Sequence, residues 1–380
     1  MQAGLTDPGR HQRFAIAILA FLLAVSALAL TGYPPAPGDA AQSANDHVFG
    51  HHEILPSKLP APYDTRTSSN PPRVVPRPAD AKLQLPPGFE ITTWAEGDME
   101  YPRWLTLAPN GDVFLADSRS GRIIVLRDTH NSGKSDERHV FASGLMQPFG
   151  MAFWHDYLYV GNTNAIVRFK YRPGQTQAEG APEKIADLPG RGYHEHWTRN
   201  IVFNPSGTKM YVSVGSASND SPGEDEIRAA ISEYNPDGSG HRLYATGTRN
   251  PIGMKFYPGT NQLWSIVQER DELGDDLPSD YLTHIQEGGF YGWPYAYIGP
   301  HPDPQNKERS DLVKKTITPD VLFQAHSAAM DVLFYQGKMF PKEYQGDAFV
   351  SLHGSWNRSK RTGYKVVRVH FQNEIGRAHV

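Results

Sequence analysis

One pattern recurs along the chain: a short strand of alternating apolar residues, a polar turn with Gly, Asn or Asp, and a second strand. The pattern begins five times, at Pro102, Pro148, Thr198, Pro251 and Ala329. The first four copies are about 46 to 53 residues apart, and further β-rich sequence follows each. A period near 50 residues with about four strands per repeat is typical of β-propeller blades. Unrelated β-sandwiches would not repeat one phrase, so the pattern predicts an all-β propeller.

Five blades are visible, and the chain ends soon after the fifth. The last seven residues, Glu374–Val380, could be encoded by a sequencing adapter, so we expect a non-native tail there. We predict a six-bladed propeller whose sixth blade is missing from a C-terminally truncated chain, with the propeller spanning residues 85–373. A ring that lacks its closing blade exposes two sheet edges.

An apolar segment near the N-terminus predicts export. Phe14–Leu30 carries no charge and follows Arg10 and Arg13. Its length lies between a signal-peptide core of about 7–15 residues and a membrane-spanning helix of about 17–25. Residues 1–31 are therefore predicted to be a cleaved signal or a hydrophobic helix that anchors the chain. The positive charges before the run place everything after it outside the cytoplasm, in the periplasm or another extracytoplasmic space.

Residues 32–84 are rich in Pro, Ser, Asp and Ala, a composition that stays extended and builds no core. We expect a disordered linker there. Its three histidines, at positions 47, 51 and 52, are expected to be solvated, because a linker gives metal ligands no fixed scaffold.

Composition excludes several classes of function. The chain has no cysteine, which excludes disulfides, zinc-thiolate sites, iron–sulfur clusters and covalently attached c-type haem. Any redox chemistry must therefore use a dissociable cofactor. The net charge of −4 and the lack of a Lys/Arg stripe give no support for nucleic-acid binding.

The candidate chemistry lies where each repeat begins. In a propeller, the loops that enter the innermost strands surround one end of the central channel, so residues just before each repeat should converge there. These residues offer bases, cations and amides: Gln147, His194, His196, Arg199, Arg249, Asn250, His326 and Ser327. Neither a Ser–His–Asp spacing nor a Gly-rich phosphate loop occurs among them. Such a set suits an anionic, carbonyl-rich ligand and one proton transfer.

A second candidate is the acidic loop 268–276, which precedes the aromatic, Gly-rich stretch 287–294. Carboxylates and flexible backbone carbonyls on a loop can supply the oxygen ligands that Ca²⁺ requires. The spacing does not match an EF-hand, and an acidic surface loop explains it equally well. The carboxylates belong to Asp271, Glu272, Asp275 and Asp276.

From about Pro86 to Phe371 the chain resembles the soluble quinoprotein glucose dehydrogenases and, more closely, their sorbosone dehydrogenase-like relatives. That family consists of six-bladed propellers that use pyrroloquinoline quinone (PQQ) and Ca²⁺. The resemblance therefore implies PQQ-dependent oxidation of an aldose or a sugar aldehyde. It rests on six motifs taken together: Glu195–Arg199 (EHWTR), Thr248–Pro251 (TRNP), Glu269–Asp276 (ERDELGDD), Gly288–Pro294 (GGFYGWP), Ala325–Ala328 (AHSA) and His353–Arg358 (HGSWNR).

The resemblance also implies roles for single residues. His196 matches the base that takes the proton from the sugar C1 hydroxyl, although His194 is a second candidate two residues away. Arg249 and Asn250 match the pair that binds the quinone oxygens, with Gln147 beside them. The resemblance further implies Arg358 or Lys365 for a cofactor carboxylate, and Tyr291 with the loop Asp271–Asp276 for calcium. Arg199 and His326 are assigned to the cofactor from their positions before the repeats.

Two other functions fit the same sequence. A calcium-dependent lactone hydrolase of the propeller type would also be exported and would use carboxylates at the channel. A non-catalytic propeller could use the same loops to grip a glycan or a protein. For the dehydrogenase, we expect electrons to leave to a separate quinone or cytochrome, because the chain has no haem motif.

Overall fold

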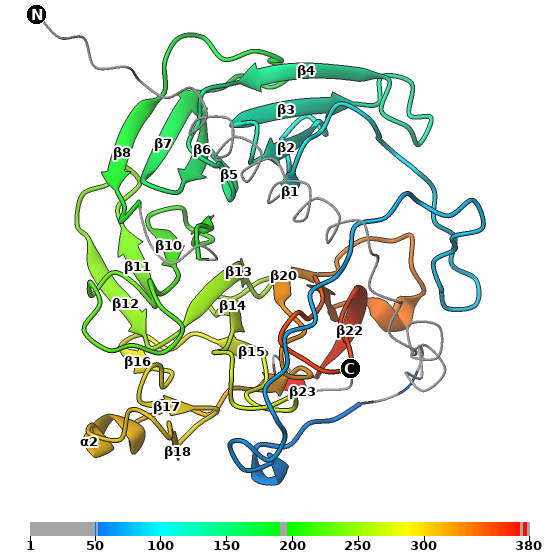
Figure 1. The fold of residues 1–380 in the computed structure, drawn as a ribbon. Helices are drawn as coiled ribbons and strands as arrows, with labels where there is room; N and C mark the ends of the chain where they lie inside the picture. The colour runs from blue at the N-terminus through cyan, green and yellow to red at the C-terminus, as the bar shows by residue number, and fades with distance from the viewer. Residues whose placement is uncertain (1–49, 51, 191–195, 373–374, 378–380) are drawn as a thin grey trace, which may run out of the picture. The chain divides into compact units, whose positions relative to one another are not determined.

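The computed structural model describes residue 50 and residues 52–190, 196–372 and 375–377, whose regular structure is almost entirely β-strand. Within these residues the strands form five sheets of four or five strands, arranged as blades around a common centre (Figure 1). The predicted all-β propeller is confirmed.

In the first three blades, antiparallel strands follow one another in sequence order from the centre outward. Their bounds are β1 (Pro102–Leu107), β2 (Val113–Asp117), β3 (Arg122–Arg127), β4 (Glu137–Ala142), β5 (Met151–Trp154), β6 (Tyr157–Asn162), β7 (Ala165–Lys170), β8 (Glu183–Asp187), β9 (Arg199–Phe203), β10 (Met210–Val214), β11 (Ala230–Tyr234) and β12 (Arg242–Thr246).

The fourth and fifth blades repeat this arrangement, with a detour before the last strand of the fourth. Their strands are β13 (Asn250–Phe256), β14 (Leu263–Gln268), β15 (Tyr281–His284), β19 (Val321–Leu322), β20 (Ala329–Phe334), β21 (Ala348–Leu352), β22 (Lys365–Gln372) and β23 (Ile375–Arg377). The detour holds β16 (Gly289–Phe290), which joins the third blade in parallel, then β17 (Ala296–Tyr297), β18 (His301–Pro302) and α2 (Ser310–Val313).

Neighbouring blades are held together by apolar clusters between their faces. In β2, Phe114 and Ala116 belong to the cluster shared with the second blade, while Leu115 belongs to a cluster on the opposite face. Successive side chains of a strand point to opposite faces, so a blade buried on both sides needs a nearly continuous apolar run. This explains why the central strands read as VFLA rather than as a strict alternation.

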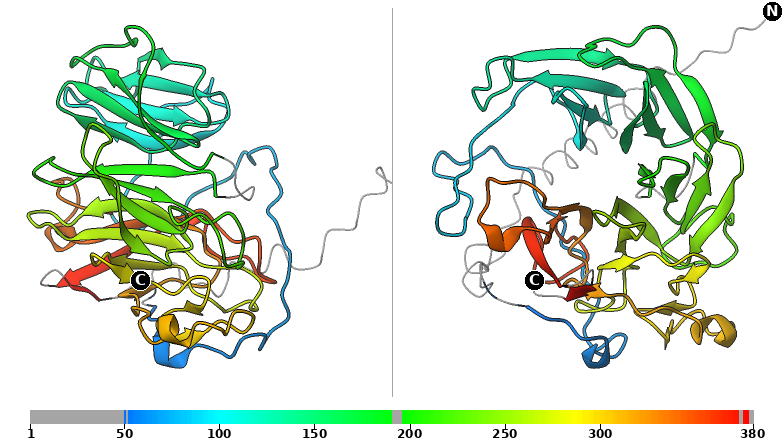
Figure 2. Two further views of the ribbon diagram at one scale, coloured as in Figure 1. Left: turned by 90° about the vertical axis from the view of Figure 1, so that its left-hand side faces the viewer. Right: turned by 180° about the vertical axis from the view of Figure 1, so that it is seen from behind.

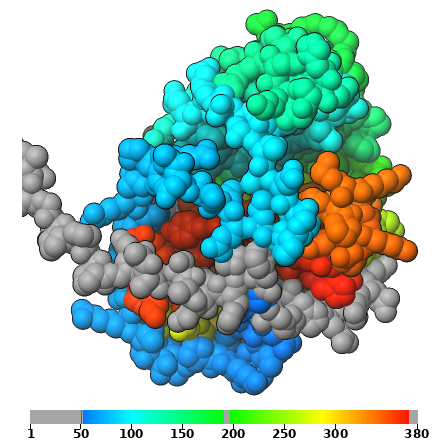
Figure 3. Space-filling view, turned by 90° about the vertical axis from the view of Figure 1, so that its right-hand side faces the viewer, coloured from blue at the N-terminus to red at the C-terminus, as the bar shows by residue number. Residues whose placement is uncertain are grey.

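Among the described residues the ring has five blades and no sixth, so the five predicted blades are confirmed and a six-bladed ring is not seen. The stretch before β1, which forms no strand, instead lies between the fifth and first blades (Figures 2 and 3). Phe89 packs 4.8 Å from the ring centroid of Phe340 at the fifth blade, and Trp94 and Met99 pack on the outer face of the first. Apolar side chains remain exposed on both flanking blades, including Leu105 and Val366.

The segments before and after the propeller can be compared with the predicted linker and the predicted non-native tail. From residue 52 to residue 84 the only helical turn is η2 (Pro56–Lys58), and part of this stretch is hydrogen-bonded to the propeller. At the other end, Ile375–Arg377 pairs with β22, within the segment predicted to be non-native. No helix among the described residues is long and apolar enough to cross a membrane, and the run at residues 14–30 lies outside them.

Two hairpin glycines allow a matched test of this packing. Gly207 and Gly259 both have positive φ, 65° and 77°. A Cβ at Gly207 would lie 1.5 Å from the Trp154 ring, whereas a Cβ at Gly259 would meet nothing within 4 Å. Both Ala substitutions should incur about 1–2 kcal/mol of backbone strain, and Gly207→Ala should lose a further 1–3 kcal/mol or so through overpacking. Urea denaturation measures this difference; equal losses would contradict the packing of the third blade on the second.

Candidate functional site

The starts of the innermost strands and the ends of the second strands meet at one mouth of the propeller. In each blade the first residues of the inner strand pair with the last residues of the next, as Arg199 does with Val214. Hydrogen bonds join these starts between blades: Gly150 N–H donates to Arg199 O at 3.0 Å, and the Asn200 amide donates to Ile252 O at 2.8 Å. The residues that precede the repeats are thereby brought together.

His196 lies at this mouth, buried directly before β9. Its Nδ1 is 2.8 Å from Ser216 Oγ and 3.0 Å from Ser216 O, and the Ser216 hydroxyl itself donates to Ser218 O. Both Ser216 oxygens therefore act as acceptors, which places the proton of the neutral ring on Nδ1. Nε2 is left as the basic nitrogen, and no described residue hydrogen-bonds it. The alternative base, His194, lies outside the described residues.

Arg249 and Asn250 flank His196. Ser216, which fixes the imidazole, donates its own N–H to Arg249 O at 2.8 Å. A Cβ at Gly215 would lie 2.3 Å from Asn250 Oδ1 and 2.8 Å from His196 Cβ, so only glycine permits this close approach. Burial first, and the Arg249 charge second, hold the pKa of His196 well below 6.5. The imidazole is therefore neutral at physiological pH.

The Arg249 guanidinium is held rigidly by Asn219, which the sequence reasoning missed. Nε donates to Asn219 O at 3.0 Å, Nη2 donates to Asn219 Oδ1 at 2.9 Å, and Nη1 donates to Glu269 O at 2.6 Å. Asn219 Oδ1 also accepts the Asp271 N–H at 2.8 Å. Its carbonyl accepts the indole N–H of Trp293 at 2.9 Å, which links the detour to the site.

Several buried or partly buried carboxylates lie near the Arg249 guanidinium. Asp271 Oδ2 is 3.3 Å from Arg249 Nη2, and Asp271 Oδ1 is 3.5 Å from Nδ1 of the buried His326. Burial opposes a charge on His326, but Asp271 outweighs it and raises the His326 pKa. Deeper still, burial raises the pKa of Glu269 to about 7 and that of Asp280 to about 6.

Other predicted cofactor residues either contact protein groups or are exposed. Arg199 donates to the backbone carbonyls of Pro189, His196 and Thr198, and burial lowers its pKa to about 9. The Arg358 side chain pairs with Asp276 at 2.6 Å. Gln147 and Lys365 are exposed, in the turn before β5 and at the start of β22. Asn250 differs, because its buried Oδ1 has no hydrogen-bond partner among the described residues.

The side chains predicted to bind calcium do not converge. Asp275 accepts hydrogen bonds from the backbone and hydroxyl of Ser359, and Glu272 points to solvent. The Tyr291 hydroxyl donates to His284 O in the core of the fourth blade. Across the described part of the chain, no three His, Asp or Glu side chains are grouped so that they could hold a metal ion. The calcium prediction therefore gains no support from these side chains.

A second cationic group lies at the mouth of the first blade and was not predicted. The Arg103 guanidinium carbon is 4.2 Å from the Tyr101 ring centroid and 5.9 Å from that of Trp197, the residue after His196. Burial lowers its pKa, its Nε has no hydrogen-bond partner, and no carboxylate of the described residues lies within 4.0 Å. Arg103 occupies the second position of the first repeat, so extending the repeat argument to that blade would have found it.

The comparisons with known proteins agree with this fold. The model of the glucose / sorbosone dehydrogenase family matches residues 99–355, so the chain belongs to that family. The resemblance stated from the motifs is confirmed.

Individual relatives are more distant. An uncharacterized protein of Borreliella burgdorferi is 28% identical over 294 residues, which is 75% of each chain. The aldose sugar dehydrogenase YliI of Escherichia coli is 25% identical over 178 residues, 42% of this chain and 45% of that one. The holo form of the pyranose dehydrogenase PQQ domain from Coprinopsis cinerea has a TM-score of 0.62 at 19% identity, over 74% of this chain and 78% of that one. The last likeness shows the fold alone.

We expect Asn219→Ala to destabilise the protein, because Arg249 and the Asp271 amide would lose buried hydrogen-bond partners. The expected loss of unfolding free energy is about 1–3 kcal/mol, measured by urea denaturation. Asn261→Ala, at an exposed turn where the structure shows no hydrogen bond of the side chain, is the control and should change little. Equal stability of the two variants would mean that Asn219 does not hold this network.

Proposed function

We propose that this chain is an exported quinoprotein dehydrogenase that oxidises an aldose or a sugar aldehyde with PQQ. The observation that carries the proposal is the buried neutral His196, whose Nε2 is free of described partners and whose Nδ1 is fixed by Ser216 beside Arg249. Membership of the glucose / sorbosone dehydrogenase family and the PQQ named for the Coprinopsis cinerea structure support it.

His196 would act as the general base. Oxidation of a sugar hydroxyl needs a group that removes the hydroxyl proton while hydride leaves the same carbon. Nε2 can accept that proton, because the Ser216 oxygens keep the other ring proton on Nδ1. The low pKa of His196 keeps the ring in its basic form, and it favours release of the proton to solvent afterwards.

The cationic and amide groups fit an anionic quinone. PQQ carries three carboxylates and, when bound, would supply the acceptor for one hydride, which carries both electrons of the oxidation. Asn250 Nδ2 donates one of its two N–H groups to Gln268 Oε1, so the second could donate to a quinone oxygen, and Arg249 is the next residue along the chain. Arg103 is a cation without a carboxylate partner among the described residues, and such a group is stabilised by an anionic ligand. We therefore assign Arg103 to a cofactor carboxylate.

Export and electron transfer complete the proposal. The apolar run at residues 14–30 would direct the propeller out of the cytoplasm, as a signal or as an anchor. Because the chain has no cysteine for covalent haem attachment, the electrons would pass to a separate quinone or cytochrome.

Replacing the proposed base should strongly reduce turnover without abolishing cofactor binding. In His196→Ala, dye-coupled oxidation of sugars by the PQQ-loaded protein should fall roughly 10²–10⁴-fold, the usual contribution of one acid–base group. PQQ should still bind, as followed by tryptophan fluorescence. His52→Ala, at an exposed histidine of the linker, is the control and should retain full activity. Undiminished turnover in His196→Ala would remove this residue from the mechanism.

A further inference from the structure

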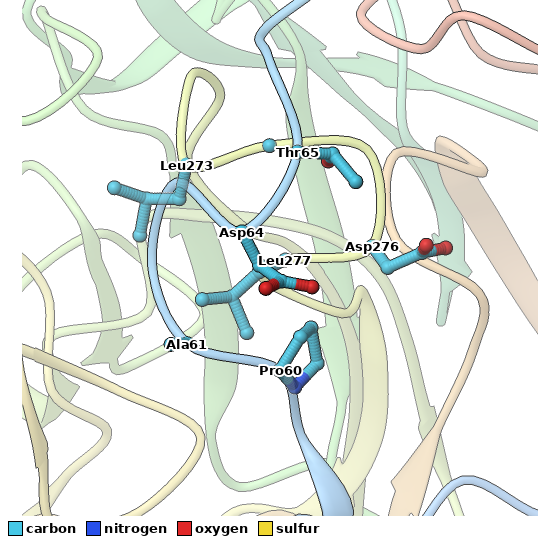
Figure 4. A pocket seen from close by; sticks show the side chains of 8 residues that line it. Pro60, Ala61, Asp64, Thr65, Leu273, Asp276 and Leu277 are labelled. Carbon is cyan, nitrogen blue, oxygen red and sulfur yellow. The ribbon is translucent and has the colours of Figure 1, made fainter.

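An extended segment before the propeller lies across the acidic loop that borders the site. We call residues 63–70 the strap. Tyr63 N–H donates to Leu273 O at 2.8 Å, and Thr65 Oγ1 accepts the Asp275 N–H at 2.7 Å. In Figure 4, Asp64 and Thr65 of this segment line a pocket together with Leu273, Asp276 and Leu277. The strap therefore holds the loop from both sides of Gly274.

Gly274 connects the strap to the site. A Cβ there would lie 2.9 Å from Thr65 Oγ1 and 3.0 Å from Thr65 O, so strap and loop are in close contact. The Gly274 carbonyl accepts a hydrogen bond from His326 Nε2 at 2.8 Å. Through its other nitrogen, His326 faces Asp271, which in turn faces Arg249. One continuous chain of contacts therefore runs from Thr65 to the guanidinium beside His196.

The strap contacts the propeller at a second point, at Ser68 and Asn70. Asn357 donates from its amide to Ser68 O at 2.8 Å and accepts the Glu272 N–H at 2.9 Å. Asn70 N–H donates to Trp356 O at 2.7 Å. The acidic loop is thus enclosed between the strap and residues 356–359. Both of these segments lie outside the part of the chain that the family model matches.

We propose that the strap positions the active site, with Thr65 as the positioning residue that fixes Gly274 and, through it, His326, Asp271 and Arg249. The proposal rests on the function proposed above. Its physical basis is that Asp271 must remain aligned to hold the guanidinium against an anionic ligand, and its loop has no strand or helix of its own from residue 269 to residue 280. A loop of this kind takes its conformation from whatever it is packed against.

The test compares three variants of the full chain: Thr65→Val, Thr65→Ser and Thr67→Val. Valine keeps the shape of threonine but removes the acceptor for the Asp275 N–H, whereas serine retains it. Thr67 is an exposed strap residue for which the structure shows no hydrogen bond. Amide hydrogen exchange of residues 272–276 reports on the loop, and titration of the apo-protein with PQQ, followed by tryptophan fluorescence, reports on the site.

In Thr65→Val, loss of one hydrogen bond should accelerate exchange in the loop and weaken PQQ binding, each by about 3- to 10-fold. Thr65→Ser and Thr67→Val should match the wild type, and the melting temperature should stay nearly constant. Faster exchange with unchanged PQQ affinity would overturn the positioning role, as would unchanged exchange. If wild-type protein fails to bind PQQ, the proposed function fails, while hydrogen exchange still decides whether Thr65 orders the loop.

Discussion

Two basic groups that cannot both be charged lie together in a buried site, and the account depends on this constraint. Arg249 carries a guanidinium, which stays protonated in proteins, and it is surrounded by acceptors from Asn219, Glu269 and Asp271. His196 has no comparable set of acceptors. Burial and the neighbouring positive charge therefore keep the imidazole neutral. The result is a fixed cation beside a neutral imidazole, which is the pair that the proposed hydride transfer from a sugar carbon to PQQ would use.

The propeller fixes the positions of His196 and Arg249 relative to each other. Each blade delivers its contribution at the start of an inner strand, and apolar clusters between blades prevent those starts from moving independently. The loops above the strands are less regular, so they rely on polar contacts. Asn219 accepts from Nε and Nη2 of Arg249, and the acidic loop accepts from Nη1 through Glu269 O and from Nη2 through Asp271. Rigid sheets and tethered loops thus contribute to the site in different ways.

The repeat explains what the sequence could predict. Because each copy begins at the same structural position, His196, Arg249 and Asn250 could be placed at one mouth from spacing alone. Position did not reveal side-chain direction: Arg199 occupies an equivalent place, yet its guanidinium turns to backbone carbonyls. For a similar reason the predicted calcium ligands gain no support, because an acidic composition cannot show that Asp276 pairs with Arg358. Asn219 and the strap lie outside the repeat, so no periodic signal marked them.

The central claim is that an acidic quinone binds at this mouth between Arg103, Arg249 and the neutral base. A structure of the protein determined after soaking or co-crystallisation with PQQ tests it most directly. The account predicts the cofactor in the mouth, with a carboxylate on Arg103, a quinone oxygen near Arg249 or Asn250, and His196 Nε2 open towards the substrate side. PQQ bound elsewhere, or bound there with His196 Nε2 turned away from it, would contradict the account.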